Sequence, residues 1–196
     1  LLVIDGVRMN NAIYRSGHLQ NAITLDPSIL RRTEVIFGPG SVLFGSDAIG
    51  GVINYRTKDP ILSTEKGRVA TTGSSWLRYG SSNNEMSGHF DFSFGFKKIA
   101  FFTSVTGAIY DDIRQGKNKF GGEDPSWGRR PEYVTKINGK DSIVPNSNPL
   151  IQIGTGYSQF DLMEKVLIQA TDSLRFILNL QYSLSSDIPR YDKLTE

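Results

Sequence analysis

The 196-residue sequence contains no cysteine and only two histidines. The absence of thiols excludes a disulfide framework, a cysteine-ligated zinc or iron–sulfur centre and a cysteine nucleophile. Two histidines are too few for a multi-histidine metal centre. No apolar run approaches the roughly 18 residues that a membrane-spanning helix needs. A closed β-barrel stays open as a membrane structure, because its backbone groups pair between strands.

An excess of one charge is also missing. Lys and Arg number 22, Asp and Glu number 20, and the net charge is +2. This balance excludes an acidic disordered chain and a strongly basic nucleic-acid-binding protein, so we predict no nucleic-acid partner. The length corresponds to one or two domains at about 150 residues each. The chain opens on an apolar strand without an initiator Met, so we expect an internal piece of a longer protein.

The sequence changes character near residue 60. Before it, short apolar runs alternate with turn-forming Gly, Pro and Asp. Asp-Gly pairs form tight turns, and Asp followed by Pro is a typical helix start. The predicted elements are strands at 2–4 and 33–37, a third strand leading to Tyr55, a turn at Asp5-Gly6 and a short helix at 26–30.

Residues 66–186 alternate apolar and polar side chains with the period of two that marks a β-strand. In the stretch 89–96 every second residue is Phe, and the opposite face carries His89, Asp91 and Ser93. The predicted strands are 68–79, 89–96, 101–109, 157–170 (with a bulge near 163–165) and 174–184.

The apolar face of these strands suits either the core of a soluble β-sandwich or the lipid-facing stripe of a barrel. The strands run for roughly 9–14 residues, closer to the 9–11 that cross a bilayer than to the 5–6 of an ordinary strand. Two tight turns, at 97–98 and 171–173, fall at one end, and a loop of about 45 residues, 111–156, falls at the other. This asymmetry is typical of outer-membrane barrels.

The most specific motif lies in the glycine-rich segment Thr33–Lys58. It lacks the Gly-Lys-Ser/Thr ending of a phosphate-binding loop. As a whole it resembles the end of the plug domain of TonB-dependent outer-membrane receptors, and Leu2–Val7 resembles an upstream strand and turn of the same plug. The matching residues include Asp5, Gly6, Glu34, Gly38, Pro39, Ser41, Gly45, Ala48, Gly50, Gly51, Val52, Ile53, Asn54, Thr57 and Lys58.

The resemblance implies a mainly β fold in two parts. Residues 1–60 would form the C-terminal part of an α+β plug domain. Residues 61–196 would form about the first five antiparallel strands of a transmembrane β-barrel of about 22 strands. The protein would lie in the bacterial outer membrane, in contact with lipid. The TonB–ExbB–ExbD complex would energise it through a short box that precedes residue 1.

One position departs from the family pattern. Phe37 stands where the family usually has Arg before Gly-Pro. The charge pairing between plug and barrel wall is therefore in question at this position. Arg31, Arg32 and Arg56 are the candidate replacements.

The segment Arg15–Asn21, followed by Leu25-Asp26-Pro27, is similar to a stretch in the haem-uptake branch of the family. This similarity implies that His18 is an axial ligand of the iron in a transported haem, because imidazole is a good iron ligand. Arg15 is predicted to bind substrate in the same segment. A hydrogen-bonded surface histidine is the alternative for His18. No intrinsic cofactor is implied, and haem or a ferric chelate would be cargo.

Three residues at the start of the long loop, Tyr110, Asp111 and Arg114, are predicted to gather substrate, with a solvated loop mouth as the alternative. His89 is predicted to line the barrel lumen. No Ser/His/Asp or paired-carboxylate motif occurs in the sequence, so no enzymatic activity is predicted.

These observations predict an active transporter for a scarce, bulky nutrient from outside the cell. Iron carried as haem or as a siderophore is the leading candidate for the cargo. Cobalamin and glycans are alternatives within the family. A soluble β-sandwich binding or adhesion module is the alternative outside it.

Overall fold

The computed structural model describes residues 1–9, 25–65, 67–116 and 128–187. The chain forms two compact units. One comprises Leu1–Trp76, His89–Thr106 and Asp161–Leu184, and the other comprises Leu77–Gly88, Gly107–Phe160 and Ser185–Glu196. Among the described residues, no helix is long and apolar enough to cross a membrane.

A four-stranded sheet occupies the first part of the chain. Its strands are β1 (Leu2–Ile4), β2 (Val7–Arg8), β3 (Leu30–Phe37) and β4 (Gly51–Thr57), in the order β2-β1-β4-β3. β1 pairs with β4 in parallel, and β3 pairs with β4 antiparallel. The predicted turn between β1 and β2 is present, with positive φ at Asp5 (48°) and Gly6 (86°).

Three short helical segments connect these strands. The predicted helix near Asp26 is a single 3-10 turn, η2 (Pro27–Ile29), and the Asp26 side chain caps it by accepting the Ser28 amide proton at 2.8 Å. A four-residue helix, α1 (Ser41–Phe44), and a second 3-10 turn, η3 (Ser46–Ala48), lie between β3 and β4. Each segment reverses the chain within a few residues.

Close packing explains one glycine of the motif. Val3, Ala48 and Val52 form a small buried core on this sheet. Gly51 enters β4 with φ of 140°, and a Cβ atom there would lie 2.9 Å from the Ile36 carbonyl oxygen. Only glycine tolerates this backbone angle at so close an approach.

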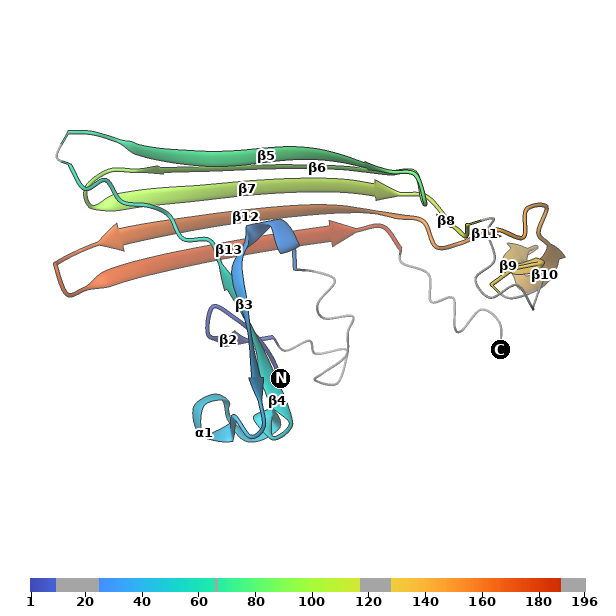
Figure 1. Ribbon diagram of the computed structural model, residues 1–196, viewed down its shortest axis with the longest axis horizontal. Coiled ribbons are helices and arrows are strands. Elements are labelled where there is room, and N and C mark those ends of the chain that lie inside the picture. Colours follow the sequence, from blue (N-terminus) through green and yellow to red (C-terminus); the bar gives the residue numbers. More distant parts are fainter. Residues whose placement is uncertain (10–24, 66, 117–127, 188–196) are drawn as a thin grey trace. The chain divides into compact units, whose positions relative to one another are not determined.

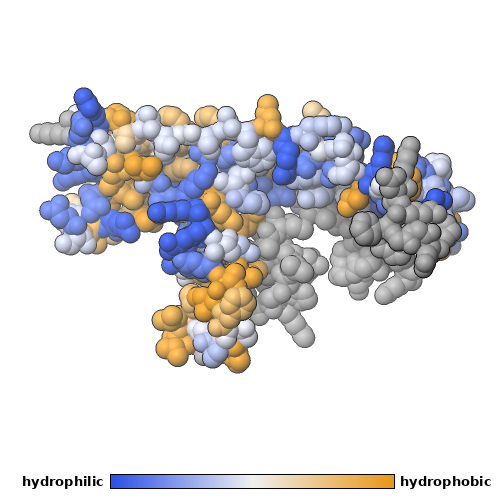
Figure 2. All heavy atoms as spheres, in the orientation of Figure 1, coloured by the Kyte–Doolittle hydropathy of each residue, from blue (hydrophilic) through white to orange (hydrophobic). Residues whose placement is uncertain are grey.

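The outer surface of this sheet carries apolar side chains. Figure 2 shows hydrophobic atoms gathered over the part that holds α1 and the end of β3. Phe37 is 91% exposed, and Val42, Leu43 and Ile49 are also exposed.

A five-stranded sheet follows, in the order β13-β12-β7-β6-β5 (Figure 1). Neighbouring strands run in opposite directions, and the tight turns after β6 and β12 lie at one end of the sheet. The strands are β5 (Ala70–Gly80), β6 (Glu85–Gly95), β7 (Ile99–Tyr110), β12 (Tyr157–Gln169) and β13 (Arg175–Ser185).

The two faces of this sheet differ as the alternation predicts. On β6, Ser87, His89, Asp91 and Ser93 are buried, whereas Phe90 and Phe92 are exposed. The apolar side chains of β13 are exposed as well. A sandwich would bury this apolar face, so the β-sandwich alternative is wrong. The bulge expected in β12 is also unnecessary, because buried residues alternate without interruption through Met163 and Lys165.

The long loop contains regular structure where it is described. β8 (Ile113–Arg114) pairs with β11 (Ile151–Gln152), and β9 (Glu132–Ile137) forms a hairpin with β10 (Lys140–Pro145). Asn138 and Gly139 make the hairpin turn with positive φ angles of 53° and 77°. The segment is therefore not a structureless connection.

Candidate functional site

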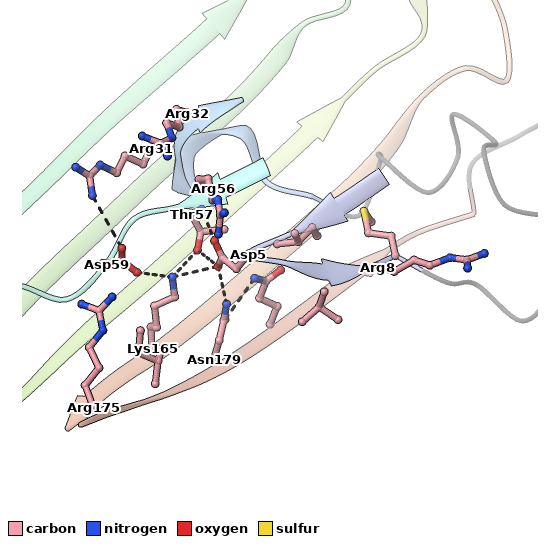
Figure 3. A pocket seen from close by; sticks show the side chains of 15 residues that line it. Asp5, Arg8, Arg31, Arg32, Arg56, Thr57, Asp59, Lys165, Arg175 and Asn179 are labelled. Carbon is pink, nitrogen blue, oxygen red and sulfur yellow. Dashed lines mark hydrogen bonds and ion pairs between the residues drawn. The ribbon is translucent and has the colours of Figure 1, made fainter. Parts of the chain in front are cut away.

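A buried lysine joins the five-stranded sheet to the four-stranded sheet. Lys165 points inward from β12, and its side chain is 2% exposed. Its Nζ donates to Thr57 Oγ1 at 2.7 Å, Asp59 Oδ1 at 2.9 Å, Asp5 Oδ2 at 3.1 Å and the Lys58 carbonyl oxygen at 3.1 Å (Figure 3). A buried charge persists only where such partners replace water. This cluster therefore fixes the end of β4 against β12.

Asp5 approaches the same lysine from the β1–β2 turn. Its carboxylate accepts the Thr57 amide at 2.9 Å, the Thr57 hydroxyl at 2.5 Å and the Asn179 side-chain amide at 3.1 Å. Burial alone would raise the pKa of Asp5. The Thr57 hydrogen bonds and the Lys165 charge outweigh burial and hold that pKa below its ordinary value of 3.8. The Asp-Gly pair of the motif thus places a carboxylate as well as making a turn.

A second polar cluster surrounds His89, whose side chain is 1% exposed. Its Nε2 lies 2.9 Å from Asp91 Oδ2, and its Nδ1 lies 2.6 Å from Thr106 Oγ1. Thr106 donates its own proton to Asp26 Oδ2 at 2.5 Å. The ring also stacks on Trp76, with centroids 5.8 Å apart.

Hydrogen-bond accounting constrains the His89 ring. The Thr106 hydroxyl has a single hydrogen, which it donates to Asp26 in a hydrogen bond. Its oxygen therefore accepts a hydrogen bond from His89 Nδ1. The Asp91 carboxylate also accepts hydrogen bonds from Lys58 Nζ at 2.7 Å and from the hydroxyl and backbone amide of Ser74. His89 therefore lies on the inner face of β6 and is buried in polar contacts there.

The arginines near Phe37 have partners in their own sheet. Arg32 lies 2.7 Å and Arg56 3.8 Å from Glu34, and Arg31 lies 4.0 Å from Asp59. None of these ion pairs of the three candidate arginines reaches a wall strand. Lys165 pairs with Asp5 and Asp59, and Lys58 pairs with Asp91, between plug residues and wall strands.

The second unit holds an open cavity of about 530 Å³ at the loop end of the strands. The rings of Tyr110 and Tyr157 stack there with centroids 4.6 Å apart. Tyr110, Asp111 and Arg114, all predicted as substrate-binding residues, line this cavity, and Asn84 donates to Asp111 at 3.2 Å. The structure therefore brings these three residues together. Arg15 and His18 lie outside the described residues.

Asp112 holds the rim of this cavity in place. Its Oδ1 accepts the backbone amides of Gly154, Thr155 and Gly156 at 2.9, 2.8 and 3.0 Å. One carboxylate oxygen thus gathers three successive amides and ties the start of the long loop to its end. Asp112 therefore has a structural role at this cavity, which Asp111 also lines.

Sequence reasoning missed two residues. Tyr157 opens a predicted strand, and nothing in its neighbourhood marks it as a partner of Tyr110. Lys165 was visible as the charge within the apparent break near 163–165. Its place on the same face as Asp161 and Met163 was the available signal for a buried charge with a partner elsewhere in the chain.

Comparisons with known proteins agree with this architecture. Residues 1–52 match the family described as TonB-dependent Receptor Plug Domain. The chain is 44% identical over 59 residues to a hemin receptor of Yersinia enterocolitica, covering 30% of this chain and 8% of the relative. It is 44% identical over 73 residues to the vitamin B12 transporter BtuB of Vibrio vulnificus (strain CMCP6), covering 37% and 11%. The chain spans about a tenth of the length of these relatives.

Solved structures show the same fold over most of the chain. The copper transporter OprC covers 94% of it with a TM-score of 0.64 at 15% identity, and the match spans 23% of that protein. The ferric enterobactin receptor PfeA of Pseudomonas aeruginosa covers 93% with a TM-score of 0.50 at 17% identity, and the match spans 25% of that protein.

The fold and the plug-domain match together define the class of protein. The four-stranded sheet is part of a plug domain, and the five long strands are part of a barrel wall. Together these findings support a TonB-dependent receptor. The domain boundary at residue 60 stays a prediction.

Proposed function

We propose that this chain is part of an outer-membrane transporter that takes up haem with energy from TonB–ExbB–ExbD. One observation supports haem as the cargo: the chain is 44% identical over 59 residues to a protein named as a hemin receptor. The Ser16-Gly17-His18-Leu19 stretch supports it, because a histidine in a plug loop offers an imidazole to haem iron. His18 is proposed as an axial ligand, with Arg15 beside it.

The loop-end cavity suits the other parts of the same cargo. The stacked rings of Tyr110 and Tyr157 offer a flat aromatic surface to a planar ligand. Arg114 offers a guanidinium to a carboxylate such as a haem propionate. Because Asp112 fixes the loop ends, these groups are arranged before the ligand binds.

A haem titration of the detergent-purified full-length receptor tests the proposal. We expect a Soret shift in the wild type that weakens at least tenfold in His18→Ala. Gln20→Ala, in the same segment, is the matched control and retains the wild-type titration. If haem gives no Soret change in the wild type, haem is excluded as cargo.

Cobalamin is the second candidate, because the match to a vitamin B12 transporter extends over 73 residues at 44% identity. The same titration with cobalamin separates the two cargoes. Binding of cobalamin at micromolar concentration, without haem binding, would replace the haem proposal. A ferric siderophore is the remaining iron chelate, and its binding would leave His18→Ala without effect.

A further inference from the structure

The plug and the inner face of the wall enclose a strongly basic cavity of about 630 Å³ within the first unit (Figure 3). Two carboxylates, Asp5 and Asp59, also line it. Six cationic side chains line the same cavity: Arg8, Arg31, Arg32, Arg56, Lys165 and Arg175.

The carboxylates do not balance these cations. Lys165 lies within 3.1 Å of both Asp5 and Asp59, so a single ammonium forms ion pairs with both acids that line the cavity. Arg32 and Arg56 share a single further acid, Glu34, and Arg31 reaches Asp59 only at 4.0 Å. Apart from Arg8, five of these cations stand against three acids, which leaves a surplus of two positive charges. A partly enclosed cavity strengthens the field of such a surplus, because less water screens it.

The shape of the lining favours oxyanions over other anions. A guanidinium presents paired N–H donors that match a carboxylate or phosphate, and four arginines from two sheets (Arg31, Arg32, Arg56 and Arg175) surround the space. Asn179 and Gln181 add amide donors, while Ile4, Val7 and Ile177 supply apolar surface. The cavity is therefore suited to a ligand that combines several carboxylates with a hydrocarbon body.

This cavity is separate from the loop-end cavity. Arg175 is the first residue of β13 and follows the tight turn at 171–173. Tyr110, in contrast, is the last residue of β7 and opens the long loop. The two cavities share no lining residue.

We infer that the basic cavity is a second binding site, for a small ligand bearing several carboxylates. Where haem is the cargo, its two propionates carry this chemistry, and this role as a later station of transport rests on the proposed function. The anion site itself does not depend on haem. A carboxylate side chain from another part of the receptor is the competing occupant.

Citrate is the probe, titrated calorimetrically into the full-length receptor in detergent at low salt. We expect submillimolar binding that weakens at least twentyfold in the triple variant Arg31→Gln, Arg56→Gln, Arg175→Gln, and that weakens with added salt. The matched control removes three exposed charges elsewhere: Lys97→Gln, Lys98→Gln and Lys136→Gln. It changes the net charge equally and retains citrate affinity within twofold.

Two results would overturn the inference. The first is equal citrate binding by the triple variant and the wild type. The second is an absence of citrate binding in the wild type, which assigns the cavity to a carboxylate of the receptor itself. If the triple variant does not fold, Arg175→Gln alone carries the comparison, with an expected loss of about threefold. A Soret titration of the same samples reports on haem separately, so the failure of one proposal is distinguishable from the failure of the other.

Discussion

The Lys165 cluster and the loop-end cavity contain similar polar side chains in different surroundings. Around Lys165, every polar group near the buried ammonium has a partner within 3.1 Å. At the loop end, Asp112 has its partners, whereas Asp111, Arg114 and the tyrosine pair line an open cavity. Saturated clusters of buried polar groups fix a structure, because each lost partner is costly. Polar groups that border open space retain the capacity to bind.

The difference also separates the contacts that hold the plug from the residues that border open space. The Lys165 and His89 clusters join plug residues to wall strands through hydrogen bonds and ion pairs. Substitutions at the two kinds of site are therefore expected to change different properties, namely stability in one case and affinity in the other.

Removing the buried ammonium should have the largest effect. Lys165→Met leaves Asp5, Asp59 and Thr57 without their shared donor, at a cost of roughly 2–4 kcal/mol, reduced from the value for a fully buried pair because Asp59 is half exposed. Denaturant unfolding of the full-length receptor measures it. Lys98→Met, at the exposed turn, is the control. Equal stability of the two variants would contradict the assignment.

The His89 cluster should be the next most sensitive. His89→Leu leaves Thr106 and Asp91 each without one partner, and we expect a loss of about 1–3 kcal/mol. His89→Gln keeps one donor and should recover part of this loss. The same unfolding assay compares them. If Leu and Gln behave alike, the hydrogen bonds are not what stabilises this site.

The plug motif offers a comparison between neighbouring glycines. Gly51→Ala forces a Cβ to within 2.9 Å of the Ile36 oxygen at a φ of 140°, and should cost about 1–3 kcal/mol. At Gly50 a Cβ meets nothing within 4 Å, so Gly50→Ala should change stability by less than about 0.5 kcal/mol. Thermal unfolding distinguishes the two. A destabilised Gly50→Ala with a normal Gly51→Ala would reverse the argument.

Sequence alone predicted most of the fold, because period-two alternation and the glycine motif are local signals. The phenylalanines of β6 appeared as an apolar face in the sequence and are exposed on that face in the structure. The error in β12 has a physical cause: Lys165 is charged but buried on the inner face of the strand, since the plug supplies its partners. No local pattern can show a partner that lies more than 100 residues away.

The candidate site was predictable only in part. Tyr110, Asp111 and Arg114 are close in sequence, so their shared cavity follows from the loop that holds them. Tyr157 stacks on Tyr110 from 47 positions further along the chain, and only strand pairing brings it there. The basic cavity likewise assembles arginines from β2, β3, β4 and β13, none of which forms a motif on its own.

Acid should weaken the plug contact at Asp5. Because the folded pKa lies below 3.8, this carboxylate contributes stability that is fully present above the unfolded value and is lost as pH falls through the folded value. Asp5→Asn should therefore be less stable than the wild type at pH 7, with the difference shrinking below about pH 4. Thermal unfolding from pH 3 to 7 measures it. A difference that grows on acidification would contradict the sign of the shift.

The loop end should show the smallest effect on stability and a clear effect on binding. Arg114 borders open space, so Arg114→Gln should change unfolding free energy by less than about 0.5 kcal/mol. Its loss should weaken haem binding about 5–10-fold, since one charge-assisted contact contributes roughly 1–1.4 kcal/mol. Arg129→Gln, a loop arginine that does not line the cavity, is the control for charge. A Soret titration of both variants decides the matter. Normal affinity in Arg114→Gln, or an equal loss in both, would place cargo recognition elsewhere and leave this cavity as a solvated loop mouth.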